Sequence, residues 1–203
     1  MIITVSREFA SGGREIGKRL SDQLNLQYYD KEVISEIAKS TSLNEEYVQK
    51  VLENGGFKNF ALSFAHSMPL TSATPNTVTE VLIAQQKVIR EIAKRGNCVI
   101  VGRCADVIAR EYNPVRLFVY ADEQSKLARC RARAKEGENL TDRQMLKSFK
   151  EIDKGRAKLY DLISSTGWGD RNGYDLFINT SRTEISKIIK PLSDLITVMS
   201  AKK

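Results

Sequence analysis

Residues 2–17, with the sequence IITVSREFASGGREIG, decide the fold of this chain. The apolar run at the start of this segment predicts a short buried strand, and the two adjacent glycines predict a tight loop after it. Beyond the loop, a helix is predicted because apolar residues recur at four-residue spacing on one face: Ile16, Leu20 and Leu24. A strand, a glycine loop and a helix in this order form the opening half of a βαβ unit.

Three further apolar runs predict strands downstream. Together with residues 2–6, they cover residues 98–102, 116–121 and 175–179. Helix starts are predicted where a capping residue precedes a helical pattern, at Asp30, Ser42, Thr77, Asp122, Thr141 and Ser181. Alternating strands and helices predict an α/β fold of three layers, a parallel sheet with helices on both faces. Ligands bind at the carboxyl ends of such strands, where Gly12, Gly102 and Asp122 fall.

Composition limits the class of protein. The chain has 203 residues, 41% hydrophobic and 28% charged, as expected of one soluble globular domain. No apolar run reaches the length of a membrane span, and the first residues lack the basic segment of a signal peptide. The three cysteines, Cys98, Cys104 and Cys130, lack metal-binding spacing, and His66 is the single histidine. A cytoplasmic protein without a disulfide framework or zinc site is predicted.

The positive charge is concentrated in one segment. The net charge is +7, and residues 126–158 hold eleven Lys and Arg against five Asp and Glu. Such a local excess favours an anionic partner, which at this point includes phosphate esters, nucleic acid and an anionic membrane surface.

The glycine loop has the outline of a phosphate site but lacks the full P-loop motif, GxxxxGK[ST]. A loop between a strand and a helix N-terminus directs free backbone N–H groups at one point, where an anion binds. We therefore predict phosphate or nucleotide binding by Arg7, Ser11, Gly12, Gly13 and Arg14. Arg14 takes the lysine position in one frame, but Glu15 then stands where the magnesium-binding hydroxyl belongs. The alternative is a simple strand-to-helix turn.

The segment that opens the chain resembles the start of the cytidylate kinase-like family, bacterial relatives of the nucleoside monophosphate kinases within the P-loop superfamily. Further segments fall in family order: YYDK at 28–31, VIVGR at 99–103, DKGR at 153–156 and YDLFINT at 174–180. The resemblance covers essentially the whole chain. It implies a P-loop kinase-like fold with a helical substrate-binding insertion at about 31–95 and a basic lid at about 126–158. Cytidylate kinases carry a lysine P-loop and a Gly-Arg-Asp triplet, whereas Cys104 follows Gly102 and Arg103 here.

The resemblance also implies roles for individual residues. Lid arginines close over the donor and acceptor phosphates, which gives catalytic candidates in Arg14, Arg129, Arg133 and Arg156. Acceptor-binding candidates are Asp30, Arg103 and Asp153. ATP or another nucleoside triphosphate with Mg²⁺ is the implied cofactor, although the magnesium ligands are not identified. Asp106 either replaces the family's aspartate or caps a helix, and the cap is the favoured alternative.

Three functions remain open at this point. The leading one is a kinase that transfers a phosphoryl group from a nucleoside triphosphate to a phosphorylated acceptor such as CMP. The second is a nucleotide or phosphate sensor with little transfer activity, and the third is nucleic-acid binding, which lacks interleaved aromatic residues in the basic segment. A homodimer is possible through the insertion, where residues 57–64 predict a short helix. Residues 55–76 and about 133–142 lack apolar periodicity and are predicted to be the least ordered.

Overall fold

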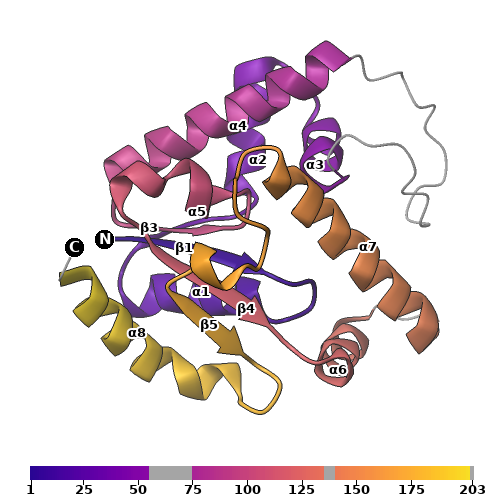
Figure 1. Cartoon of the computed structure of the whole chain (residues 1–203), viewed down its shortest axis with the longest axis vertical. Helices are drawn as coiled ribbons and strands as arrows, with labels where there is room; N and C mark the ends of the chain where they lie inside the picture. Colours follow the sequence, from indigo (N-terminus) through magenta and orange to yellow (C-terminus); the bar gives the residue numbers. More distant parts are fainter. Residues whose placement is uncertain (55–74, 135–139, 202–203) are drawn as a thin grey trace.

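The computed structural model describes residues 1–54, 75–134 and 140–201. Its centre is a five-stranded parallel sheet in the order β2-β3-β1-β4-β5, shown in Figure 1. The strands are β1 (Ile2–Arg7), β2 (Gln27–Tyr29), β3 (Cys98–Val101), β4 (Val115–Tyr120) and β5 (Leu176–Asn179). The four predicted strands are confirmed. Sequence reasoning missed β2, because it has three residues and no apolar run.

Helices cover both faces of the sheet, so the three-layer prediction is confirmed. One face carries α1 (Gly13–Gln23) and α8 (Ile185–Ala201), and the other carries α2 (Glu32–Thr41), α3 (Glu45–Asn54), α4 (Pro75–Arg95) and α5 (Ala105–Ile108). Alternate side chains of β3 join different cores. Val99 and Val101 pack with α1 and α8, whereas Cys98 and Ile100 pack with the other helices. This alternation is the two-residue period of a strand buried on both faces.

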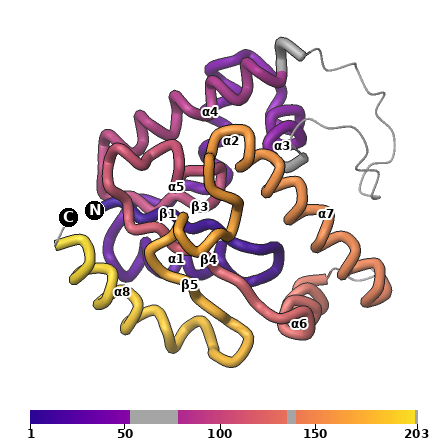
Figure 2. Tube along the Cα trace, viewed as in Figure 1, coloured from indigo at the N-terminus to yellow at the C-terminus, as the bar shows by residue number. Residues whose placement is uncertain are grey.

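Two helices stand beyond the carboxyl ends of the strands. These are α6 (Glu123–Arg133) and α7 (Asp142–Asp161), and Figures 1 and 2 show them on the side where β1 runs into its loop. Short 3₁₀ turns, η1 (Arg110–Tyr112) and η2 (Arg171–Gly173), complete the described elements. Within these described elements, no helix is long and apolar enough to cross a membrane.

The predicted helix starts are partly correct. Asp122 accepts a hydrogen bond from the Ser125 amide, and Thr141 forms a full capping box with Gln144. The other four predictions are wrong. Asp30 lies before α2 and pairs with an arginine, Ser42 follows α2 as its left-handed C-cap residue, and Ser181 precedes α8, which begins at Ile185. The box at Thr77 lies inside α4, which begins at Pro75, where a proline needs no N–H partner.

The start of α3 shows why the Ser42 prediction failed. Asn44 accepts a hydrogen bond from the Glu46 amide at 2.8 Å, so the side chain that caps α3 comes two residues later. The helix expected at residues 57–64, His66 and most of the two segments predicted to be least ordered lie outside the described residues.

The sheet has a switch point between β1 and β3. The helix that follows β1 is α1, and the helix that follows β3 is α5, and these two lie on opposite faces of the sheet. The connections therefore diverge and leave a crevice at the carboxyl ends of both strands, which is where open α/β sheets bind ligands.

Candidate active site

The loop between β1 and α1 is closed by its two glycines. Gly12 has a φ of 86°, which favours glycine, and a Cβ on it would overlap the Ile185 side chain. A Cβ on Gly13 would overlap the side chain of Arg7. The first helical hydrogen bond runs from the Ile16 amide to the Gly12 carbonyl, so the amides of the first turn before it have no helical partner.

Arg7 occupies the crevice at the switch point. Its side chain is mostly buried and lies between the glycine loop and the end of β3. This position follows from Gly102, the residue after β3, where an added Cβ would overlap the Arg7 guanidinium. Gly102 has a φ of 72°, so a side chain there would be strained as well as blocked. Asp30 lies 3.9 Å from the guanidinium. Gly13 and Gly102 together make the space that Arg7 fills.

Four guanidinium groups gather in this crevice. Burial lowers the pKa of Arg7 from its usual range to about 9, and the positive charge of Arg156 adds to the effect, as do Arg103 and Arg14, while Asp30 opposes it. We call Arg7, Arg14, Arg103 and Arg156 the arginine cluster. Like charges held this closely in a partly buried site favour the binding of an anion between them.

Arg14 points toward the end of β2. Its Nε lies 2.5 Å from Asp30 Oδ2, and Asp30 is 3% exposed. Both residues line a cavity of about 710 Å³ beside Tyr28, Glu32 and, across the opening, Arg133. Arg14 therefore lies beside the glycine loop and is already paired with a carboxylate.

The helix α7 contacts the same loop through Arg156 and Asp153. Arg156 Nη1 donates to the Arg7 carbonyl at 3.0 Å and to Asp153 Oδ1 at 2.9 Å. The same Asp153 oxygen accepts from the Phe9 amide at 2.8 Å, and burial raises the pKa of this carboxyl. The sequence prediction that Asp153 and Arg156 share a helix face is confirmed, because both meet the loop at one place.

The helix α6 contacts the loop on its other side. Arg129 donates to the Thr180 carbonyl at 2.7 Å and to the Ala10 carbonyl at 3.4 Å, and its Nε lies close to Gly12. Arg133, one turn later, lies 3.4 Å from Glu15 at the surface, whereas Arg131 pairs with Asp142 on α7. The predicted division holds: Arg129 and Arg133 face the loop and α1, and Arg131 faces elsewhere.

The hydroxyl groups near the loop are used internally. Ser11 is fully buried, and its hydroxyl donates to the Glu8 carbonyl at 2.9 Å, while its amide reaches the same oxygen at 3.4 Å. Ser6 donates to Asp106 at 3.1 Å. The favoured alternative for Asp106 was a helix cap, and this prediction is wrong. Asp106 is buried, accepts a second hydrogen bond from Tyr160 at 2.7 Å, and burial raises its pKa.

Two carboxylates of the cavity that Arg14 lines could hold a magnesium ion bound together with a triphosphate, provided that Asp30 gives up its ion pair with Arg14. In such sites Mg²⁺ takes one or two carboxylates and completes its shell with phosphate oxygens and water. Asp30 Oδ1 is buried and accepts no hydrogen bond from the described residues, and Glu32 lines the same cavity. Among the described residues, no group of three or more His, Cys, Asp or Glu is placed to hold a metal ion.

The comparison with known families decides the relationship. The model of the cytidylate kinase-like family matches residues 2–182. The chain belongs to the cytidylate kinase-like family. The resemblance inferred from the sequence is thereby confirmed. No curated protein matches the chain.

Solved structures extend the family assignment to the fold. An uncharacterized protein from Eubacterium ventriosum aligns with a TM-score of 0.70 and 24% identity, over 97% of this chain and 98% of that one. A shikimate kinase from Bacteroides thetaiotaomicron aligns with a TM-score of 0.58 and 14% identity, over 97% and 98%. A shikimate kinase from Acinetobacter baumannii, in complex with shikimate, gives 0.53 and 15%, over 97% and 93%. The chain therefore has the fold of the P-loop kinases.

In this member of the cytidylate kinase-like family, most predicted site residues lie around one crevice. Arg7, Arg14, Asp30, Arg103 and Arg156 lie at the ends of β1, β2 and β3, with Asp153, Gly12 and Arg129 on the neighbouring side of the loop. Ser11 is a buried residue of the loop itself, and Arg133 lines the cavity beside Arg14.

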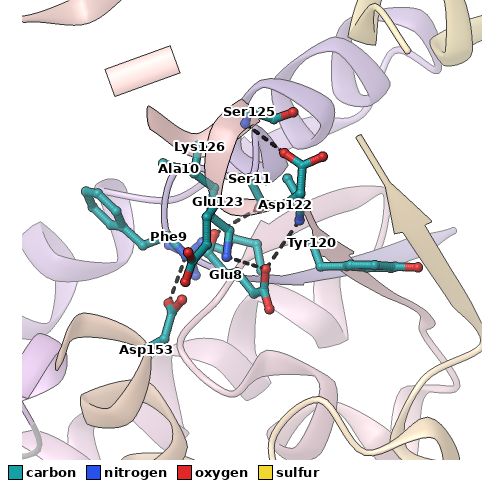
Figure 3. A network of polar contacts seen from close by, with 12 residues as sticks. Glu8, Phe9, Ala10, Ser11, Tyr120, Asp122, Glu123, Ser125, Lys126 and Asp153 are labelled. Atoms are coloured by element: carbon teal, nitrogen blue, oxygen red, sulfur yellow. Dashed lines mark hydrogen bonds and ion pairs between the residues drawn. The ribbon is translucent and has the colours of Figure 1, made fainter. Parts of the chain in front are cut away.

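Sequence reasoning missed three residues that hold the loop. Thr180 donates to the Ser11 carbonyl at 2.6 Å, and Lys126 lies 2.6 Å from Glu8, as Figure 3 shows for the latter pair. Thr180 ends the family segment 174–180, and Glu8 lies in the opening segment, so both belong to segments that the sequence pattern had already singled out. Nothing in their spacing indicated that they would meet partners more than 100 residues away.

Proposed function

We propose that this chain is a nucleotide-dependent kinase that transfers the terminal phosphoryl group of a nucleoside triphosphate to an acceptor that already carries a phosphate. The observation that carries this proposal is the arginine cluster at the switch point of the sheet. Phosphoryl transfer needs in-line positioning and positive charge around the transferred group, and a crowd of guanidinium groups at a ligand crevice supplies that charge.

Arg7 is the best candidate for the work of the absent P-loop lysine. The sequence assigned that place to Arg14, but Arg14 is paired with Asp30 at the end of β2. Arg7 reaches the same crevice from the end of β1, and Gly13 and Gly102 give it room. A planar guanidinium can hold two phosphate oxygens at once, which suits the bridging region of a triphosphate.

The acceptor belongs on the β3 side of Arg7. Arg103 lies at the end of β3 in a left-handed conformation with a φ of 59°, and Arg156 reaches down from α7. Two arginines around one crevice suit a phosphate on the acceptor, and a nucleoside monophosphate such as CMP has that group. Asp153 beside Arg156 provides an acceptor of hydrogen bonds for a sugar hydroxyl.

Magnesium, when bound, neutralises charge on the triphosphate and orients its oxygens. Asp30 and Glu32 would hold it at the end of β2. Arg129 then lies on the far side of the loop, close to Gly12, where a donor phosphate on the loop amides would meet it. In this arrangement three elements each contribute a cation: Arg7 comes from the end of β1, Arg156 from α7 and Arg129 from α6.

A second candidate function is a nucleotide or phosphate sensor with weak transfer. The observation that favours it is that Ser6 and Ser11, the nearest hydroxyls for magnesium, are engaged in internal hydrogen bonds. A sensor needs an anion site but no acceptor site. The two functions therefore differ in the need for Arg103.

The experiment that tests the proposal joins binding to turnover. A thermal-shift screen of nucleoside triphosphates and monophosphates, with and without Mg²⁺, identifies ligands of the native state. The best pair is then assayed for formation of a nucleoside diphosphate from both partners. We expect turnover in the unmodified chain, loss of turnover in Arg7→Met, and an increase mainly in the acceptor KM in Arg103→Ala.

Arg131→Ala is the matched control, because Arg131 lies on the same α6 as Arg129 but pairs with Asp142 at the surface. Its kinetics should equal those of the unmodified chain. Nucleotide binding without turnover for any acceptor would favour the sensor, and full turnover in Arg7→Met would contradict the role of Arg7.

A further inference from the structure

Glu8 is the first residue after β1, and its side chain joins the glycine loop to the start of α6. Its carboxylate lies 2.6 Å from Lys126 Nζ and accepts a hydrogen bond from the Ala121 amide at 3.3 Å. Figure 3 shows Glu8 and Lys126 between the loop and α6. We call this contact the loop clasp: Glu8, Lys126 and the Ala121 amide.

The partner of Glu8 is a buried cation. Lys126 is 8% exposed, whereas lysines are almost never buried to this extent unless they are paired. In the part of the chain that the structure describes, Lys126 forms an ion pair with one carboxylate, that of Glu8. Some other ion pairs of α6 and α7 are solvent-exposed, such as Lys150 with Glu123 at 3.2 Å, and exposed pairs of that kind contribute little. The loop clasp therefore adds a largely buried ion pair to the contact that Arg129 makes between α6 and the loop.

The loop clasp also sets the place of Arg129. Lys126 and Arg129 are three residues apart on α6, so they lie on neighbouring parts of one helix face. Arg129 donates to the Ala10 carbonyl and lies close to Gly12, which places it over the turn of the loop. A rotation or shift of α6 that broke the Lys126 contact would also move Arg129.

We propose that Glu8 is a positioning residue: through Lys126 and the Ala121 amide it fixes α6 against the glycine loop and so holds Arg129 over Gly12. The expected effect of Glu8 on donor binding rests on the proposed function, whereas its expected effect on the order of the loop does not. Glu8 is assigned a positioning role because its carboxylate contacts Lys126 of α6 and the Ala121 amide at the β4–α6 junction.

The first measurement needs no ligand and no activity. Amide hydrogen exchange of residues 8–13 and 121–133 is compared in the unmodified chain, Glu8→Gln and the control Glu123→Gln, which loses only the exposed pair with Lys150. We expect exchange in both segments to rise by about tenfold in Glu8→Gln, and to stay unchanged in Glu123→Gln. Unchanged exchange in Glu8→Gln would overturn the proposal whatever the chain catalyses.

The second measurement separates positioning from stability. Glu8→Gln removes the ion pair of the buried Lys126 and should lower the Tm, whereas Glu8→Gln with Lys126→Met removes both charges and should regain most of it. The KM for the nucleoside triphosphate should rise about tenfold in both variants, with kcat less affected. A purely structural role predicts instead that KM returns to normal together with the Tm.

The third measurement links the loop clasp to Arg129. If Glu8 acts by holding Arg129, the KM of Glu8→Gln with Arg129→Ala should be no higher than that of Arg129→Ala alone. Independent, multiplying effects would overturn the link. If the unmodified chain shows no turnover, the same comparison is made on the dissociation constant of ATP or tripolyphosphate. That outcome would contradict the proposed function while the exchange experiment still decides the role of Glu8.

Discussion

Replacing Arg7 with methionine is expected to stabilise the folded chain while abolishing phosphoryl transfer. The guanidinium of Arg7 is mostly buried and has three arginines around it and one carboxylate, Asp30, 3.9 Å away. Burial, and then Arg156, lower its pKa from the usual range to about 9, which means that the folded state disfavours the charge relative to the unfolded chain. Methionine has a similar unbranched stem and no charge.

The magnitude follows from the same shift. At about 1.4 kcal/mol per pKa unit, keeping Arg7 charged costs the folded state at most about 5 kcal/mol. The variant also loses contacts of the guanidinium with its surroundings, so we expect a net gain of roughly 1–3 kcal/mol. For a chain of this length such a gain raises the Tm by roughly 3–10 °C.

The pH dependence gives an independent check of the sign. Below about pH 9 both the folded and the unfolded chain keep the proton on Arg7, so the full penalty is present. Between about pH 9 and 12.5 the folded chain binds fewer protons than the unfolded chain, and its stability rises relative to that of Arg7→Met. The stability gap between the two proteins should therefore narrow as the pH is raised above 9.

The assay is thermal unfolding of both proteins at neutral pH and near pH 10, without ligand and with inorganic pyrophosphate. Pyrophosphate should raise the Tm of the unmodified chain, because it neutralises the arginine cluster, and should have a smaller effect on Arg7→Met. A variant that is less stable than the unmodified chain and gains as much from pyrophosphate would refute the reasoning. It would show that Arg7 is a structural residue whose charge the fold already satisfies.

Further predictions concern single contacts. Gly102→Ala should lower stability by about 1–3 kcal/mol and impair turnover, because the new Cβ overlaps Arg7 at a positive φ; chemical denaturation and kinetics test both, and unchanged turnover would contradict it. Asp106→Asn should flatten the pH profile of stability, because burial raises the pKa of Asp106 and makes its ionisation unfavourable as the pH rises through that value; a profile like that of the unmodified chain would show that Asp106 stays unprotonated. Thr141→Ala should cost about 1 kcal/mol through loss of the capping box of α7, and an unchanged denaturation midpoint would contradict it.

The elements of the fold were predictable where a local pattern determines them. The apolar runs of β1, β3, β4 and β5 predicted the strands, and the boxes at Asp122 and Thr141 predicted the starts of α6 and α7, because their side chains bond to amides within one turn. Asp30 and Asp106 satisfied the same local rule and were mispredicted. Their partners, Arg14 and Tyr160, come from other elements, and no local pattern shows that.

The candidate site was predictable in its members but not in its internal arrangement. Arg7, Arg14 and Arg129 were all identified from the glycine loop and the basic segment. How they are arranged around the crevice depends on the pairing of Arg14 with Asp30 and on the space beside Gly102, and both are tertiary facts. The loop clasp was beyond sequence reasoning for the same reason, since Glu8 and Lys126 are joined only by the packing of α6.

We propose that Arg7 does the work of the absent P-loop lysine, and two glycines supply the room for its side chain. In the sequence, adjacent glycines before a helix indicate a loop that lets phosphate approach the backbone. In the structure, Gly13 and Gly102 give their space to the side chain of Arg7. The cation of Arg7 comes from the end of β1, so its side chain is buried and its backbone belongs to a strand. A lysine on the first turn of α1 would instead be attached to a helix end. A buried cation is less hydrated and more strongly repelled by its neighbours, and both effects increase its gain from an incoming phosphate. The crowding of Arg7 is thus unfavourable for the empty site and favourable for the occupied one.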